Sequence, residues 1–278
     1  MTGGWRLALL GGSVDGSPSP QMHNAMLRAC GLEGEYVARS CTAAELPAIL
    51  AELRDGRLNG AQVTMPHKIA VAQACDRLAG DAALTGSVNT VVVDGDELVG
   101  HSTDAGGLEA ALRHDGLWPS PGGRAVVLGA GGAAAAVVLT LARAGCEEVL
   151  VAARRVVAAE ELARSMSATV PVRAMAFTDV RLRDAVDAAG VLVNATPVGL
   201  GGLPVDPWRL GPGVTVVDLR YRPRPVDLVE ACRARGLRAG DGLEMLAQQA
   251  AQSFALWTGM HPSVEVARAA LLAAVGTW

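Results

Sequence analysis

"RAVVLGAGGAAAAVVLTLARAG", residues 124–145, decides the fold of this chain. An apolar run ends in a glycine turn, and an alanine-rich stretch of helical composition follows. Gly129, Gly131 and Ala134 have the spacing of a dinucleotide fingerprint, in which the first glycine permits the turn and the second lets backbone approach a pyrophosphate. The following helix N-terminus favours negative charge. The stretch predicts a strand, turn and helix that bind a dinucleotide; a purely structural turn is the alternative.

The next apolar run, "CEEVLVAARR" at residues 146–155, predicts a second strand that ends in Arg154 and Arg155. A site selective for NAD usually has an Asp or Glu there, which holds the ribose 2′-hydroxyl. Two guanidinium groups suit a 2′-phosphate instead. Two solvated arginines are the alternative, although positive charge at a helix start opposes the helix dipole. The sequence therefore favours NADP as cofactor, with NAD possible.

On both sides of this stretch, short apolar runs alternate with longer runs of helical period, which is typical of βα units. Residues 87–103 read instead as a hairpin around the turn "DGDE", and the Pro/Gly-rich residues 117–123 have the composition of a boundary. We predict an α/β protein with an N-terminal parallel-sheet α/β substrate domain and a C-terminal Rossmann dinucleotide-binding domain. The first comprises residues 1–103 plus 243–278, because the tail helices return to it, and the second comprises residues 104–242.

Composition limits the classes of partner. The chain has 278 residues, half of them hydrophobic, and a net charge of -4, so it can bury two cores but offers no broad basic field for nucleic acid. No apolar stretch is long enough to cross a bilayer without glycine or charge. The five scattered cysteines fit reduced thiols, and the five histidines form no metal-ligand pattern. We expect a cytoplasmic monomer or homodimer that binds a small molecule, no metal, no membrane and no nucleic acid.

Polar side chains gather where the strands of the first domain should end. Ends of parallel strands at one edge of a sheet face the same crevice, so these side chains could converge. Singly, each has another explanation as a turn former or helix cap. Together they predict a site for a polyhydroxylated acid. The residues are Ser17, Ser19, Thr64, Lys68, Asn89 and Asp104.

Lys68 is the one lysine among 24 basic residues. A lysine ammonium can be tuned to give up its proton, whereas an arginine guanidinium stays charged. A leftover surface lysine in a chain encoded by GC-rich codons is the alternative.

Eight ordered segments of the chain resemble the shikimate dehydrogenase family. They are "SPSPQMHNAM" (17–26), "QVTMPHK" (62–68), "GSVNT" (86–90), "STDAGG" (102–107), "GAGGAA" (129–134), "NATPVG" (194–199), "DLRYRP" (218–223) and "DGLEMLAQQAAQSFALWTG" (241–259). The resemblance implies an enzyme that reversibly reduces 3-dehydroshikimate to shikimate with NADP.

The resemblance also implies roles for individual residues. Lys68 and Asp104 would flank the carbon that is oxidised or reduced and handle the attached oxygen, as hydride transfer requires. Ser17 and Ser19, with Tyr221, would hold the substrate carboxylate. The remaining roles are ring-hydroxyl binding by Thr64, Asn89 and Gln249, and cofactor binding by Gly129, Gly131, Gly132, Ala133, Arg154, Arg155, Asn194, Thr196 and Pro197.

Several positions depart from the family pattern and leave alternatives open. Asp15 and Gly16 change the lead-in to the serines, Gln62 and Ser102 each stand where the family usually has Asn, and "ARR" (153–155) stands in place of Asn-Arg-Thr. Quinate, or an amino-substituted ring acid of a specialised pathway, fits the same residues. A non-catalytic ligand-binding sensor is a further alternative, but a binder has no need of the proton chemistry of Lys68 and Asp104. An NAD-dependent quinate enzyme would prefer the missing carboxylate.

Overall fold

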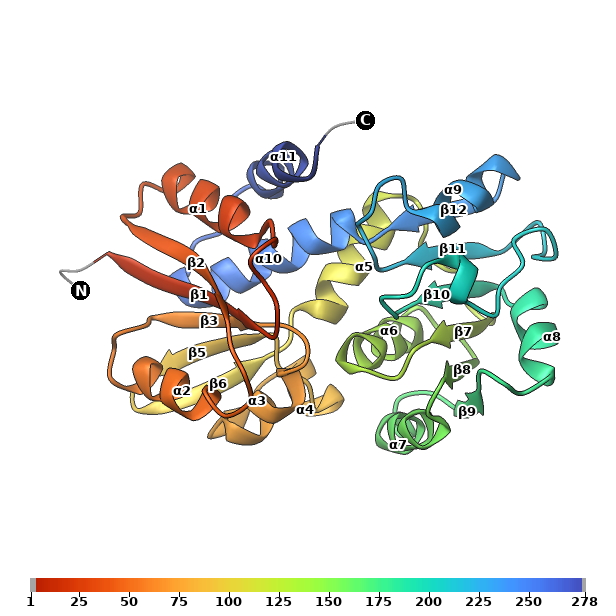
Figure 1. Cartoon of the computed structure of the whole chain (residues 1–278), viewed down its shortest axis with the longest axis horizontal. Coiled ribbons are helices and arrows are strands. Elements are labelled where there is room, and N and C mark those ends of the chain that lie inside the picture. Colours follow the sequence, from red (N-terminus) through yellow and green to blue (C-terminus); the bar gives the residue numbers. More distant parts are fainter. Residues whose placement is uncertain (1–3, 277–278) are drawn as a thin grey trace. The chain divides into compact units, whose positions relative to one another are not determined.

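A computed structural model describes residues 4–276, and the chain divides into two compact units (Figure 1). The first unit comprises Met1–Gly107 and Leu246–Trp278, and the second comprises Leu108–Met245. Each unit is described by itself below. The chain passes between them within two helices, α5 (Asp104–His114) and α10 (Leu243–Thr258), and the domain boundaries predicted from sequence lie at the first residues of these helices.

The first unit contains a six-stranded sheet in the order β2-β1-β3-β5-β6-β4. Five strands run the same way, and only β5 is antiparallel to its neighbours. The predicted hairpin explains this reversal, because β5 and β6 are its two arms; the sheet is therefore mixed rather than wholly parallel. The strands are β1 (Trp5–Gly11), β2 (Gly34–Ser40), β3 (Gly60–Val63), β4 (Arg77–Leu78), β5 (Thr90–Asp94) and β6 (Glu97–His101).

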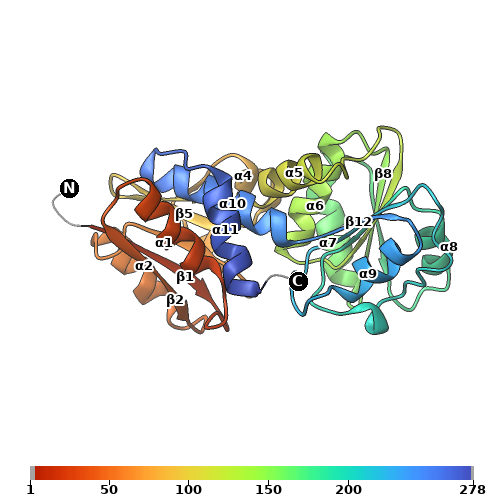
Figure 2. The same ribbon diagram turned by 90° about the horizontal axis from the view of Figure 1, so that it is seen from above.

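Both faces of this sheet are covered, and alternation along β1 shows how. Ala8 and Leu10 point into a core shared with the helices that follow β2 and β3, whereas Leu7 and Leu9 pack in a cluster with Trp257 of α10. Gly60 makes room for that tryptophan, since a Cβ there would lie 2.4 Å from the indole ring. The helices are α1 (Ser19–Ala29), α2 (Leu46–Arg54), α3 (Lys68–Ala74), α4 (Asp81–Thr85) and α11 (Val264–Val275). Figure 2 shows α11 lying beside α1.

The second unit is a doubly wound sheet with six parallel strands in the order β12-β11-β10-β7-β8-β9. The strand order reverses between β7 and β10, and ligands of such sheets bind at that switch point, outside the carboxyl ends of the strands. The strands are β7 (Arg124–Leu128), β8 (Glu148–Ala153), β9 (Val172–Ala176), β10 (Val191–Asn194), β11 (Thr215–Asp218) and β12 (Arg238–Asp241). The helices are α6 (Gly132–Arg143), α7 (Val156–Met166), α8 (Arg181–Asp187), the 3-10 turn η1 (Leu200–Gly202) and α9 (Asp227–Ala234).

Alanine richness lets α6 lie close to the sheet. Every residue from 134 to 141 is buried, and the first three are alanines, whose small side chains permit close approach of the two backbones. Within residues 4–276, no helix has the length and apolar character needed to span a membrane.

Candidate active site

Lys68 and Asp104 meet in the first unit. Lys68 is the first residue of α3, and Asp104 is the first residue of α5, which follows β6. The Lys68 Nζ donates a hydrogen bond to Asp104 Oδ2 at 2.5 Å, and the side chains are only 14% and 7% exposed. The fold thus joins an ammonium and a carboxylate that lie 36 positions apart in the chain.

Asn89 holds the other oxygen of that carboxylate. Its Nδ2 donates to Asp104 Oδ1 at 2.9 Å, and its Oδ1 accepts from the backbone N–H of Thr103 at 2.9 Å. A backbone N–H can only donate, so this contact fixes which end of the amide is oxygen. Both carboxylate oxygens of Asp104 therefore have a donor, and Asn89 orients the group that faces Lys68.

Gln249 of α10 joins the same network. Its Oε1 accepts from Gln62 Nε2 at 3.0 Å and from Asn89 Nδ2 at 3.2 Å, while its Nε2 donates to the carbonyl of Leu246 at 3.1 Å. The hydroxyls of Thr103 and Ser253 lie 3.1 Å apart in this network. Sequence reasoning assigned no role to Gln62, Thr103 or Ser253. The one available signal was Ser253, four residues after Gln249 on the same helical face.

The network ends at a buried ring pair. Tyr36 donates its hydroxyl to Gln62 Oε1 at 2.7 Å, and His23 Nε2 lies 3.0 Å from the same oxygen. The two rings stack with their centroids 4.2 Å apart. Burial lowers the pKa of His23 to about 3, partly offset by the hydrogen bond to Gln62, so the imidazole is neutral near pH 7. Its Nδ1 has no partner, which fits a tautomer that carries its proton on Nε2.

This buried histidine predicts a loss of stability in acid. Between about pH 6.5 and pH 3 the unfolded chain binds a proton at His23 that the folded protein excludes, so the free energy of unfolding falls as pH falls, by up to about 1.4 kcal/mol per pH unit. A His23→Phe variant keeps a stacked ring and should lose this part of the slope. Urea unfolding at several pH values measures it, and equal slopes for wild type and variant would contradict the assignment.

The predicted carboxylate-binding serines lie in the loop between β1 and α1. Ser17 Oγ donates to Ser19 Oγ at 3.1 Å and accepts from the Ser19 backbone N–H at 3.2 Å; Ser19 is buried and Ser17 partly exposed. Thr64 follows β3, and its methyl group would lie 2.5 Å from a Cβ at Gly11, so that position needs glycine. Neither the serines nor Thr64 hydrogen-bonds to Lys68 or Asp104 within the described part of the chain.

Tyr221 lies in the second unit, after β11, and is half-buried. Burial raises the pKa of its hydroxyl, which therefore stays protonated and can donate a hydrogen bond near pH 7.

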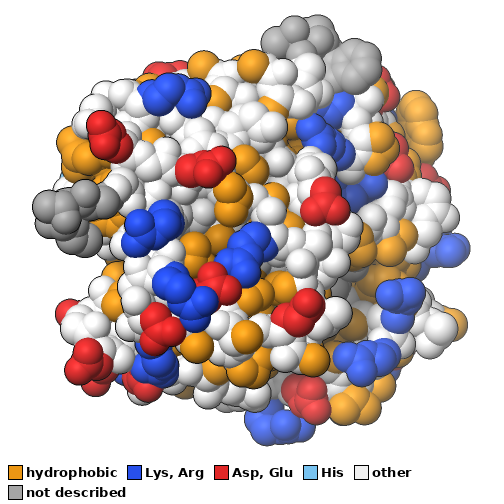
Figure 3. Space-filling view, turned by 60° about the vertical axis from the view of Figure 1, so that its left-hand side comes forward, with side chains coloured by type: hydrophobic (Ala, Val, Ile, Leu, Met, Phe, Trp, Pro, Cys, Tyr) orange, Lys and Arg blue, Asp and Glu red, His pale blue; other side chains and the backbone are white. Residues whose placement is uncertain are grey.

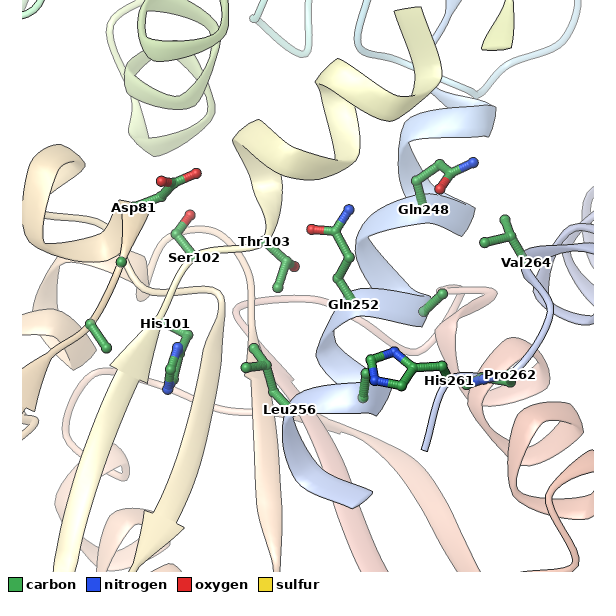
Figure 4. Close-up of a pocket in the computed structure, with 14 residues that line it drawn as sticks. Asp81, His101, Ser102, Thr103, Gln248, Gln252, Leu256, His261, Pro262 and Val264 are labelled. Atoms are coloured by element: carbon green, nitrogen blue, oxygen red, sulfur yellow. The ribbon is translucent and has the colours of Figure 1, made fainter. Parts of the chain in front are cut away.

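A second hollow of the first unit, about 510 Å³ in volume, lies behind the segment that carries Asp104 (Figure 4). His101, Ser102 and Thr103 line one side, and Gln252 and Leu256 of α10 line another. Thr103 is common to this hollow and to the network. None of the site residues predicted from sequence lines it.

In the second unit, the glycine turn lies at the switch point. Gly129 has φ +116°, and a Cβ there would lie 3.0 Å from the backbone oxygen of Ala195, so only glycine fits. Gly131 precedes the first residue of α6, Gly132, and a Cβ on it would meet no atom within 4 Å. Backbone at the start of α6, including Ala133, is therefore open to an anion.

The segment after β10 forms the other wall of this turn. Asn194 is buried, and its Oδ1 accepts from the Thr196 backbone at 3.0 Å and from the Thr196 hydroxyl at 2.7 Å. Its Nδ2 donates to the carbonyl of Val198 at 3.0 Å. The Asn194 side chain thus shapes the turn that contains Thr196 and Pro197. Its predicted direct contact with cofactor remains a prediction.

Arg154 and Arg155 follow directly after β8, and both are exposed. The first turn of α7 has no acidic residue, and neither arginine pairs with a carboxylate in residues 4–276. Two free guanidinium groups at the end of the second Rossmann strand suit a phosphate, because guanidinium and phosphate geometries match. In the same range, no group of three His, Cys, Asp or Glu side chains could hold a metal ion.

These two units define a class of protein. A doubly wound sheet with a glycine turn at its switch point, joined to a unit that pairs a lysine with an aspartate, is typical of dehydrogenases that use a nicotinamide cofactor.

Comparisons with known proteins give the family. Residues 9–91 match the family described as shikimate dehydrogenase substrate binding domain, residues 119–198 match shikimate/quinate 5-dehydrogenase, and residues 242–272 match shikimate 5'-dehydrogenase C-terminal domain. The shikimate dehydrogenase (NADP(+)) of Rubrobacter xylanophilus is 41% identical over 95% of this chain and 94% of its own length. That of Geobacter metallireducens is 37% identical over 97% and 96%. The chain belongs to the shikimate dehydrogenase family.

Solved structures agree with this assignment. A Thermus thermophilus shikimate 5-dehydrogenase in complex with NADP(H) and shikimate superposes with a TM-score of 0.85, at 38% identity over 97% of this chain and 99% of that one. A quinate dehydrogenase from Corynebacterium glutamicum in complex with NAD gives a TM-score of 0.88 at 31% identity, over 97% and 99%. The predicted family and fold class are confirmed.

Proposed function

We propose that this protein catalyses the reversible, NADP-dependent reduction of 3-dehydroshikimate to shikimate. The observation that carries the proposal is the contact of 2.5 Å between Lys68 Nζ and Asp104 Oδ2, in a unit that matches a substrate-binding domain. Residues 1–103 plus 243–278 would bind the ring acid, and residues 104–242 would bind NADP.

Lys68 handles the proton in this mechanism. Bound NADPH supplies a hydride from nicotinamide C4 to the carbonyl carbon of the substrate. As the carbon–oxygen π electrons move onto oxygen, the Lys68 ammonium donates a hydrogen bond to that oxygen and then its proton, which gives the alcohol. Asp104 holds the ammonium in place, and Asn89 holds Asp104. In the oxidative direction the neutral Lys68 amine takes the hydroxyl proton.

The other polar residues would bind the substrate without taking part in the chemistry. Ser17 and Ser19, with the protonated Tyr221, offer hydroxyl donors for a carboxylate. Thr64 and Gln249 offer a hydroxyl and an amide for ring hydroxyls. Asn89, whose amide group is occupied by protein contacts, orients Asp104 first and contacts substrate second.

In the second unit, the bare backbone at Gly131 and Gly132 would receive the pyrophosphate, and Arg154 and Arg155 the 2′-phosphate. An Arg154→Ser/Arg155→Ser double variant should raise KM for NADP by about 10–100-fold and change KM for NAD little, because charge-assisted bonds to the phosphate are lost. Steady-state kinetics with each cofactor measures this. A double variant that keeps the wild-type preference would rule out both arginines as the phosphate site.

A quinate dehydrogenase is the alternative that a specific observation favours, namely the TM-score of 0.88 to such an enzyme. That enzyme is in complex with NAD, whereas the first turn of α7 here lacks an acidic residue and two arginines precede it. We therefore place shikimate and NADP first. A purely ligand-binding role is not favoured by a buried Lys68–Asp104 pair.

Steady-state assays of the purified protein test the proposal. Shikimate, quinate and amino-substituted analogues would each be offered with NADP and with NAD. We expect the highest kcat/KM for shikimate with NADP. A higher value for quinate with NAD would replace the proposed substrate and cofactor, and no oxidation of any acid would favour a binding role.

We also propose that the protein acts in the cytoplasm as a monomer or homodimer, without nucleic acid or membrane partners. The net charge of -4 supports this, and so does the face seen in Figure 3, where basic side chains lie interspersed with acidic ones. Light scattering during size-exclusion chromatography would give the mass, and a larger assembly would contradict this part.

A further inference from the structure

We propose that Gln62 is a positioning residue which fixes Gln249 as a hydrogen-bond donor toward the substrate, so that the ring substituent facing Gln249 must be an oxygen and not an ammonium group. The inference rests on the proposed function, because it concerns the same ring acid. It extends that function by naming the chemistry the site rejects.

One backbone group sets the orientation of Gln249. The carbonyl of Leu246 can only accept, and it lies 3.1 Å from the Gln249 side chain. The atom facing it must therefore be Nε2. Gln249 Oε1 consequently faces Gln62 and Asn89.

Gln62 supplies a donor from one side. Its Oε1 is taken by the hydroxyl of Tyr36 at 2.7 Å and by His23 Nε2 at 3.0 Å. Its Nε2 then donates to Gln249 Oε1 at 3.0 Å and to Ser253 Oγ at 3.1 Å. The side chain is buried, and every hydrogen-bonding atom of its amide has a partner, so rotating the amide would place like groups against each other.

Asn89 supplies a donor from the other side. The backbone N–H of Thr103 holds its Oδ1 at 2.9 Å, so its Nδ2 is the atom that contacts Gln249 Oε1 at 3.2 Å. Gln249 Oε1 thus accepts two N–H groups, which use both lone pairs of a carbonyl oxygen.

What remains on Gln249 is a donor. One hydrogen of its Nε2 is bonded to Leu246, and the other has no acceptor within residues 4–276. A hydroxyl or carbonyl oxygen can accept that hydrogen. An ammonium group has no lone pair and would set N–H against N–H, with both donors unsatisfied. Sites built to bond one polar group reject analogues strongly for this reason.

The experiment compares substrates rather than rates alone. Shikimate and its two analogues with a non-reacting ring hydroxyl replaced by an amino group would be oxidised with NADP near pH 7, where the amine is protonated. For the analogue whose amine faces Gln249, we expect the wild-type kcat/KM to be lower than for shikimate by about 100-fold or more. A Gln62→Met variant, of similar length without the donor, should reduce this ratio at least about tenfold, because Gln249 can then rotate.

Two further variants keep the test interpretable. Tyr36→Phe removes only the hydroxyl at the far end of the network, and it should lower the ratio in the same direction if Gln62→Met does not fold. Gln252→Met changes a glutamine of the same helix that lines the separate hollow, and it should leave the ratio unchanged. Thermal unfolding confirms that each variant is folded.

The outcomes separate cleanly. Equal loss of kcat/KM on all three acids in Gln62→Met and Tyr36→Phe would make Gln62 merely structural and overturn the inference, as would a wild type that accepts both amino analogues as readily as shikimate. A wild type that oxidises none of the acids contradicts the proposed function instead. Calorimetric dissociation constants for the same acids then test the donor arrangement by themselves.

Discussion

Replacing Lys68 with alanine should lower kcat for shikimate oxidation by about 10²–10⁴-fold, the usual contribution of a positioned acid or base. The reason is specific to this site. The variant loses the group that takes the hydroxyl proton and also leaves Asp104, which is 7% exposed, without its cation. Stopped-flow measurement of NADPH formation at saturating substrate gives the rate of this step.

A Lys68→Arg variant is the matched control. It keeps the positive charge but cannot give up a proton at ordinary pH. It should therefore bind shikimate with a dissociation constant nearer to wild type while its kcat stays low. Near-normal kcat in Lys68→Ala would remove Lys68 from the chemistry, and near-normal kcat in Lys68→Arg would leave it only an electrostatic role.

Replacing Gly131 with valine should raise the dissociation constant for NADP by about 100-fold, or about 2.7 kcal/mol, without unfolding the protein. Gly131 has φ -96° and ψ -173°, which a valine adopts readily, and its Cβ would meet no protein atom within 4 Å. The new side chain would occupy space over the N-terminus of α6, where the pyrophosphate would bind. Fluorescence titration measures the affinity.

Gly129 provides the contrast. A Gly129→Ala variant puts a side chain at φ +116° and 3.0 Å from backbone, so it should lower the free energy of unfolding by about 1–3 kcal/mol as well as weaken binding. Wild-type NADP affinity in Gly131→Val would exclude the glycine turn as the pyrophosphate site.

The sequence predicts the framework of the molecule well, because its signals are local. The stretch 124–145 contains strand, turn and helix in order, and the structure places β7, the turn and α6 there. The hairpin over residues 87–103 is likewise a local pattern. Lys68 and Asp104 can be paired from sequence because ends of strands in one sheet converge. The boundaries near 104 and 243 fall inside continuous helices, for which composition gives little signal.

The supporting network could not be predicted, because it depends on contacts between distant segments. Gln62 and Gln249 are 187 positions apart, and their hydrogen bond depends on the packing of α10 against β3. A buried glutamine in a strand looks no different in sequence from an exposed one. Asn194 shows the same limit on a smaller scale: its position after β10 is predictable, but its bonds to Thr196 and Val198 depend on the folded turn.

The central claim is that a hydride leaves the ring carbon of shikimate for the nicotinamide while Lys68 takes the proton. Shikimate that carries deuterium on the carbon of the reacting hydroxyl, incubated with NADP⁺ and the wild-type protein, tests it directly by mass spectrometry. We predict that the deuterium appears on the nicotinamide of the NADPH formed. Deuterium that stays on the ring acid, or that is lost to water, would contradict the mechanism.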